Sequence, residues 1–335
     1  LSRVDLTTEV VGVGELDNKF LENSGGDDAT IDSATTEWGQ AKLLKIETGT
    51  PSKVLAGAEF QVYDVNADGT CTAPLEGDPL EVSGEDTFVS NAAGVVDIEV
   101  PSSQFLSPDN TVLNQAMLVK SASPISGYFL NRRNASTDMS YLLDLSALGT
   151  TYRVLGWQQA YGALQMSVTA VNDGTTVTIT PAIALSSGQA AGVPFTVNLN
   201  AGQSAIYLAS DGHDLSGSLI VASQPVAVFS GATCSNVPVG TGACDHLYTQ
   251  LPPGNHFASE YVVPDTARTG STGNLVRILA ATDNTQVTVD GVVVATLAAG
   301  QFHEIATAHD LRIQTSQPTL VGQYLKRFAQ IDQVI

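Results

Sequence analysis

Basic side chains are scarce in this sequence. Its 335 residues include 14 Lys and Arg against 34 Asp and Glu, so the formal net charge is −20, and charged residues of both signs make up only 14 % of the chain. Proteins that bind nucleic acids or anionic membranes neutralise phosphate with Lys and Arg. The charge balance therefore argues against nucleic acid as a partner, and it suits a protein that stays soluble in salty or extracellular surroundings.

Long apolar runs are also missing. No stretch of about eighteen consecutive apolar residues occurs, so we expect no membrane insertion. The sequence begins at Leu1 and not at Met, which predicts a processed chain whose signal peptide has been removed. We therefore expect a secreted protein, either extracellular or at the cell surface.

Catalytic signatures are missing as well. The sequence has no serine-nucleophile elbow, no phosphate-binding glycine loop and no His-Glu-x-x-His motif. Carboxylate pairs are common in so acidic a chain, and none stands out as an acid and base couple. We predict that the protein is not an enzyme, and we expect no cofactor beyond a calcium ion at one acidic turn.

Cysteine is rare, with three copies in the chain. Cys234 and Cys244 lie ten positions apart in a stretch rich in Gly, Pro and Asn, a spacing that suits a disulfide closing a loop of an exported protein. Two reduced, buried thiols are the alternative. Cys71 is left over, and it is either free or joined to another chain.

A short phrase of sequence occurs three times, about a hundred residues apart. The fainter first copy is at 62–70, 91–94 and 121–124. The two clear copies match in the same order: 168–175 with 278–285, 200–203 with 298–301, 213–215 with 309–311, and 222–225 with 315–318. Fixed order at a near-fixed period indicates one folding unit used three times. His213 and His309, each followed by Asp, are equivalent in this repeat, which favours a shared turn over a catalytic pair.

Strand patterns dominate the chain. Alternating or β-branched runs such as 167–171, 195–199 and 287–294 are separated by Asp-Gly turn sequences, and segments of helical period are hard to find. This pattern predicts an all-β fold of tandem β-sandwich units, immunoglobulin-like or prealbumin-like, with an N-terminal extension strand. We expect units at 37–131, 132–231 and 232–335. The last strand of each unit is expected to begin at an x-Ser-x-Pro sequence, because proline is tolerated at a strand start.

Residues 1–36 belong to none of the copies. Residues 3–14 are strand-like, and residues 24–30 form a flexible, Gly-rich linker. The apolar residues of the predicted strand are Val4, Leu6, Val10, Val11 and Val13. A lone strand is not stable in water. It either covers an edge of this chain's own sheet or adds to the open sheet edge of a neighbouring subunit as a polymerisation strand.

One turn has the composition of a calcium loop. Asp64, Asn66 and Asp68 alternate and are followed by Gly69, which places three oxygen ligands around a sharp turn. The bidentate acid expected at the twelfth position is missing, because Leu75 occupies it. The string therefore has two interpretations, a calcium site or a plain hairpin turn.

Several motifs after residue 121 carry a family resemblance. They are 123–125 (SPI), 147–153 (ALGTTYR), 171–179 (VNDGTTVTI), 222–228 (ASQPVAV), 244–253 (CDHLYTQLPP) and 260–264 (EYVVP). With these motifs, residues 121–326 resemble the amino-terminal domain of IgGFc-binding proteins, a secreted family. The resemblance implies an extracellular, non-enzymatic binding or structural module.

Residues 40–131 resemble a second family. The similar segments are 42–47 (KLLKIE), 55–63 (LAGAEFQVY), 91–98 (NAAGVVDI) and 123–128 (SPISGY). They resemble the strands of a collagen-adhesin B-type or pilin domain, which implies a prealbumin-like sandwich. Lys45 stands near the lysine that many such domains join to Asn in an isopeptide bond. The acid that assists this bond is missing from 117–121 (MLVKS), so we do not expect the bond.

Two functions follow from these patterns. The first is a structural subunit of a cell-surface filament or layer, pilus-like, that self-associates by donating its N-terminal strand to a neighbouring subunit. The alternative is a monomeric adhesin or mucin-like binding module that recognises a glycan or a protein. The first predicts filaments, and the second predicts a soluble monomer that responds to a ligand.

Overall fold

The computed structural model describes residues 38–47, 50–54, 59–64, 88–89, 95–100, 112–114, 116–121, 125–133, 136–158, 161–209, 213–240, 244–266 and 273–326. All regular structure in these ranges is β-strand, apart from two single turns of 3-10 helix at Leu145–Ala147 and Gly254–His256. The predicted all-β fold is confirmed. No helix within these ranges has the length and hydropathy needed to cross a membrane.

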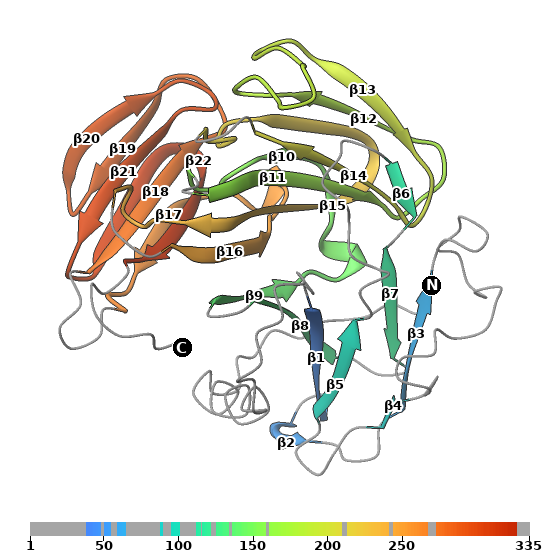
Figure 1. The fold of residues 1–335 in the computed structure, drawn as a ribbon. Coiled ribbons are helices and arrows are strands. Elements are labelled where there is room, and N and C mark those ends of the chain that lie inside the picture. The colour runs from blue at the N-terminus through green and yellow to red at the C-terminus, as the bar shows by residue number, and fades with distance from the viewer. Residues whose placement is uncertain are drawn as a thin grey trace.

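Two small antiparallel sheets are built from the first part of the chain, and we call them the N-terminal sheets (Figure 1). The larger contains β1 (Trp38–Glu47), β2 (Thr50–Val54), β5 (Val95–Val100), β8 (Ile125–Arg133) and β9 (Ser136–Leu142). The smaller contains β3 (Glu59–Asp64), β4 (Phe88–Val89) and β7 (Met117–Ser121). In the larger sheet β1 is central, because it pairs with both β5 and β8.

Strands β10 to β16 form what we call the middle unit, and β17 to β22 form the C-terminal unit (Figure 1). The strands of the middle unit are β10 (Gly149–Arg153), β11 (Tyr161–Ala170), β12 (Thr175–Thr180), β13 (Phe195–Leu199), β14 (Gln203–Leu208), β15 (Leu219–Ser235) and β16 (Asp245–Gln250), with β6 (Val112–Asn114) added beside β14. The strands of the C-terminal unit are β17 (Ala258–Val263), β18 (Asn274–Ala280), β19 (Thr285–Val289), β20 (Val292–Leu297), β21 (Phe302–Thr307) and β22 (Leu311–Leu325).

The middle and C-terminal units share one pairing scheme. The long strand β15 pairs through its first part with β10 and β12, and through its second part with β11. In the same way β22 pairs first with β17 and β19 and then with β18. The two clear sequence copies are therefore equivalent in structure. The faint first copy does not follow the scheme: β8, which comes after its x-Ser-x-Pro sequence, pairs with β1 and β9 and not with β3.

In the two clear copies the proline of the x-Ser-x-Pro sequence does not begin a strand, contrary to the sequence-based expectation, whereas in the faint first copy β8 begins at Ile125, directly after Pro124. Pro225 lies inside β15 and Pro318 lies inside β22. Residues 222–225 bulge out opposite Thr150 of β10, because the pairing jumps from Val221 to Val226. Residues 315–318 form the equivalent irregularity against β17. A bulge leaves ladder positions unpaired, so proline, which has no N–H, is tolerated there.

The repeated polar residues of the two copies hold equivalent turns. Each supplies a side-chain oxygen that accepts a hydrogen bond from a backbone N–H, which satisfies a donor where the ladder is interrupted. The equivalent acceptors are Asp173 and Asp283 for Ala201 and Ala299, Gln203 and Gln301 for Asn200 and Ala298, and Ser223 and Ser316 for Thr176 and Gln286. The repetition in the sequence is therefore explained by turn geometry.

The cores of the two units are continuous. Leu279 and Leu320 belong to the C-terminal unit, yet they pack with the buried residues of the middle unit. The boundary expected between residues 231 and 232 falls within β15. Residues on both sides of this position pair with β16. The arrangement places a buried interface between the two units, and the polar groups in it form the candidate site.

Candidate functional site

The residues chosen from sequence lie mostly outside the described residues. Those outside are Val4, Leu6, Val10, Val11 and Val13 of the predicted polymerisation strand and Asn66 and Asp68 of the predicted calcium string. Asp64 is the last residue of β3. Within the described ranges, no group of three or more His, Cys, Asp or Glu side chains could hold a metal ion. Calcium binding and strand donation stay predictions.

The disulfide between Cys234 and Cys244 is present, as their spacing predicts. It joins the end of β15 to the residue before β16, with the two Cα atoms 5.0 Å apart. The bridge closes the connection between these two paired strands. In the chain-entropy picture a loop of this length stabilises the fold by on the order of 3 kcal/mol.

Sequence reasoning did not single out Arg277, which lies at the centre of the interface between the units. Every residue of β18 is buried. One face of this strand, with Val276, Ile278 and Ala280, packs into the core of the C-terminal unit. The alternation of a strand turns Arg277 to the opposite face, toward the middle unit. Its exposed fraction is only 4 %.

Two carboxylates neutralise the buried guanidinium. Arg277 Nη1 lies 2.6 Å from Oδ2 of Asp214, which precedes β15, and Nε lies 3.0 Å from Oε2 of Glu304. Glu304 is the residue directly opposite Arg277 in the register of β18 and β21. A buried arginine is tolerated only with such partners, because an unpaired charge in a protein interior is costly.

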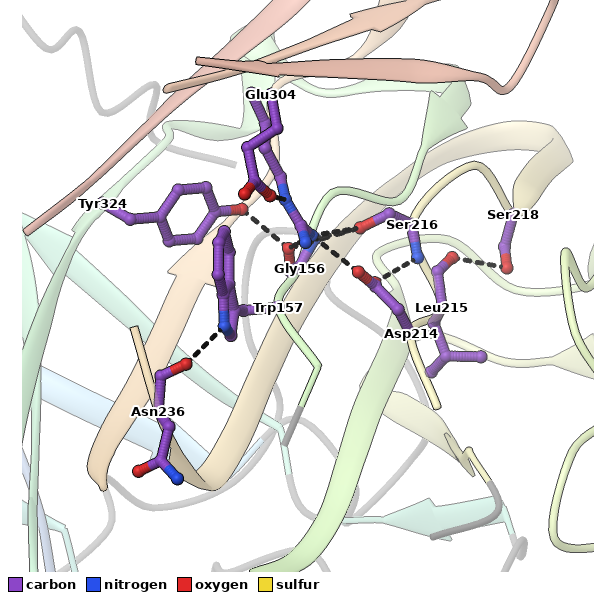
Figure 2. Close-up of polar contacts among 10 residues, drawn as sticks. Gly156, Trp157, Asp214, Leu215, Ser216, Ser218, Asn236, Glu304 and Tyr324 are labelled. Carbon is purple, nitrogen blue, oxygen red and sulfur yellow. Dashed lines mark hydrogen bonds and ion pairs between the residues drawn. The ribbon is translucent and has the colours of Figure 1, made fainter. Parts of the chain in front are cut away.

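The carbonyl oxygen of Gly156 also binds the C-terminal unit, through two side-chain donors (Figure 2). It accepts hydrogen bonds from Nη1 of Arg277 at 2.6 Å and from the hydroxyl of Tyr324 at 2.8 Å. A Cβ at Gly156 would lie 2.8 Å from Oγ of Ser230, so a larger residue would require this side chain or the backbone of Gly156 to move. The backbone of the middle unit is thereby fastened to two strands of the C-terminal unit.

Aromatic rings enclose the same guanidinium. Its central carbon lies 3.9 Å from the ring centre of Trp157 and 4.3 Å from that of Phe302. Trp157 is fixed in turn, because its Nε1 donates to the carbonyl of Asn236 at 2.7 Å (Figure 2). Burial raises the pKa of the Tyr324 hydroxyl, which keeps it protonated as a donor. Stacking of a desolvated cation on aromatic faces adds to the ion pairs.

The repeat contains a signal for this site. Asp214 belongs to the repeated His-Asp-Leu phrase, and its counterpart Asp310 accepts from the N–H of Asp265 at 2.7 Å. Asp214 accepts from the N–H of Ser216, two residues along the chain, at 2.9 Å, and in addition it binds Arg277. The two aspartates therefore accept from different kinds of donor, Asp214 within its own turn and Asp310 across 45 residues. Among the described contacts, the bond to Arg277 is made by the aspartate of the middle copy.

A second junction fastens the larger N-terminal sheet to the middle unit. Strands β9 and β16 lie near each other at sheet edges (Figure 1). Asp138 of β9 accepts from the N–H of Tyr248 at 2.7 Å, and the hydroxyl of Ser140 accepts from the N–H of Gln250 at 2.7 Å. Side-chain oxygens of β9 thus satisfy backbone donors of β16 that no described strand pairs with on that side.

The carboxyl group of Asp138 is poorly solvated. Burial raises its pKa to about 6, against the opposing effect of the hydrogen bonds from the N–H groups of Tyr248 and Met139, and the charge of Asp245 raises it further. Tyr248 packs beside it between Phe129 and Phe229, with ring centres 5.3 and 5.5 Å apart. The junction is therefore apolar around one titrating acid.

These contacts define an all-β protein in which two equivalent sandwich units and a preceding sheet are joined by buried polar contacts. The chain belongs to the IgGFc-binding protein family, whose profile, described as IgGFc binding protein, matches residues 138–333. The match covers both repeated units and the Arg277 junction.

Two curated relatives are similar to parts of the chain. The human IgGFc-binding protein is 32 % identical over 161 residues, which is 47 % of this chain and 3 % of that protein. Fimbrial subunit type 2 of Actinomyces naeslundii is 34 % identical over 76 residues, which is 21 % of this chain and 14 % of that protein. The chain therefore spans only a small part of either relative. No solved structure was found to match.

Proposed function

We propose that this chain is an extracellular, non-enzymatic structural protein, a subunit of a cell-surface filament or layer. Neighbouring subunits are joined when the predicted N-terminal strand of one copy, residues 3–14, pairs with an open sheet edge of the next. The fimbrial relative supports a surface assembly, and the secreted family resemblance supports an extracellular location.

The observation that carries the proposal is the pair of buried junctions. Arg277 ties the C-terminal unit to the middle unit, and Asp138 ties the larger N-terminal sheet to the middle unit. Domains that move independently are usually connected by small, polar, hydrated interfaces. Here Arg277 is buried and ion-paired, and the carboxyl group of Asp138 is poorly solvated, so we infer that the units form one stiff body suited to transmitting force along a filament.

Deletion of residues 1–20 tests the proposal. The full chain is expected to form filaments or layers visible by negative-stain microscopy, and the shortened chain is expected to remain a monomer by light scattering. A matched control replaces Thr7 and Thr8 by Ser, which keeps the apolar side of the predicted strand. Assembly that is unchanged by the deletion would rule out strand donation.

One observation favours a second function. The matching family is described by the binding of a protein ligand, and the human relative carries the same description. A monomeric adhesin or mucin-like module that recognises a protein or glycan would use the same stiff body to present a binding face. This function predicts a monomer at high concentration whose melting temperature rises when ligand is added.

A further inference from the structure

Strand β16 completes the middle unit by covering the second edge of β15. Residues 229–232 of β15 pair on one side with β11. On the other side Phe229 pairs with Gln250 and Ala232 pairs with Leu247, both in β16. The second part of β15 is therefore an interior strand.

The part of β22 that corresponds to residues 229–232 of β15 is found by aligning the pairing of the two units. Ala170 ends β11 and pairs with Val226, and Ala280 ends β18 and pairs with Thr319. The carbonyls of both alanines accept from a glycine N–H at 2.9 Å, which fixes the equivalence. Residues 322–325 of β22 thus correspond to residues 229–232 of β15.

The counterpart of β16 is not found in the described part of the C-terminal unit. Gly322 pairs with Arg277 and Leu325 pairs with Asn274, both in β18, and no described strand pairs with the opposite side of residues 322–325. We call that side the β22 edge. The side chain of Leu325, at its end, is 56 % exposed. An edge that offers peptide groups and an apolar side chain is a template for an added strand.

We propose that the β22 edge accepts the predicted N-terminal strand of a second copy of this chain, which takes the place that β16 has in the middle unit. This inference rests on the proposed function and names the acceptor in it. The added strand would pair with residues 322–325 and extend the sheet of β18 and β21.

Two features of the chain favour this occupant. Residues 3–14 are apolar, partly β-branched and outside every repeat, so they need a partner strand. Residues 15–37 can span roughly 75–80 Å when extended, enough to reach a neighbouring subunit. Residues 326–335 are less suited, because they contain no Gly, Asn or Pro to form a tight hairpin turn back to this edge.

Disulfide trapping with the chain lacking residues 1–20 tests the acceptor. The acceptor chain carries Cys71→Ser and a single new thiol, Leu325→Cys at the β22 edge. The control is Val293→Cys, at an exposed valine of the edge strand β20. The probe is a peptide of residues 1–20 with Val10→Cys or Val11→Cys, and a scrambled peptide reports random collision.

The expected result is that one of the two peptides forms a disulfide with Leu325→Cys about ten- to a hundredfold faster than with Val293→Cys, because pairing raises the local thiol concentration. Faster reaction at Val293→Cys would place the acceptor at β20 and overturn this inference, while leaving strand donation intact. If trapping at Leu325→Cys occurs only after residues 327–335 are removed, those residues occupy the β22 edge in the intact chain, which would also overturn this inference. A peptide that reacts with neither, together with a full chain that does not assemble, would overturn the proposed function as well.

Discussion

Nη1 of Arg277 lies 2.6 Å from Oδ2 of Asp214, although 63 residues separate them and they come from different repeated units. The ion pair is therefore a tertiary contact between the two copies. Neither copy makes it alone, since Arg277 is on β18 and Asp214 precedes β15. The stability of the two-unit body should depend on this contact more than on any exposed ion pair.

Arg277→Ala is expected to lower the free energy of unfolding by about 3 kcal/mol, because it leaves the partly buried Asp214 without its counter-charge and empties the space between Trp157 and Phe302. Urea unfolding followed by circular dichroism measures the loss. The matched control is Arg312→Ala, which breaks the exposed pair with Glu260 and should cost less than about 1 kcal/mol. Equal losses for the two variants would contradict the importance assigned to the junction.

The junction at Asp138 should give the fold a pH dependence. Its pKa rises from 3.8 to about 6 on folding, so the folded state holds the proton more tightly than the unfolded state. Stability from this group is therefore complete below pH 3.8 and is lost as the pH rises through about 6. Relative to wild type, Asp138→Asn should gain about 2 kcal/mol of unfolding free energy between pH 4 and 6.5. A difference between the two proteins that stays constant over this range would contradict the assignment.

Removal of the Cys234–Cys244 disulfide should destabilise the protein. Cys234→Ser with Cys244→Ser is expected to lower the unfolding free energy by on the order of 3 kcal/mol, because the loop between β15 and β16 is no longer closed in the unfolded chain. Cys71→Ser serves as the control and should change little. Thermal unfolding with and without a reducing agent measures both, and a reductant should affect only proteins that keep the bridge.

Gly217 and Gly300 should tolerate no side chain where the units meet. Gly217 has φ +96°, and a Cβ there would overlap the carbonyl oxygen of Gly300. Gly217→Ala should therefore cost both the strain of a positive φ, about 1 kcal/mol, and the displacement of the neighbouring unit. Gly188→Ala is the matched control, because its φ is +95° and the space around it is open. Similar melting temperatures for the two variants would show that the units are not tightly packed at this point.

The tightest turns of the repeat were predictable because each depends on a side-chain oxygen close along the chain. Gln203 and Gln301, for example, each accept from the backbone N–H three residues earlier, in Asn-Ala-Gly-Gln and Ala-Ala-Gly-Gln phrases that match in the sequence. The disulfide was predictable for the same reason, since its two residues are close in sequence. Local geometry can be read from spacing, and these features are local.

The interface could not be predicted in this way. Arg277 meets Gly156 across 121 residues; its apolar neighbours indicate a buried strand, but they do not indicate which distant groups pair with it. The prediction for Pro318 was wrong for a related reason. A strand start and a bulge both tolerate a residue without an N–H, and the sequence does not distinguish them. The pairing of β22 before and after Pro318 shows that it lies in a bulge. Strand β18 is buried on both faces because the middle unit covers the face that carries Arg277, and the sequence does not show which unit provides that cover.

The long strands β15 and β22 have a mechanical consequence. Each runs through a bulge and pairs with different strands before and after it, so one continuous backbone belongs to two ladders of its unit. The two ladders cannot be separated by breaking contacts between side chains alone, because the same strand would have to leave both. A pull on either end of such a strand loads both ladders together, and each unit should yield as a whole.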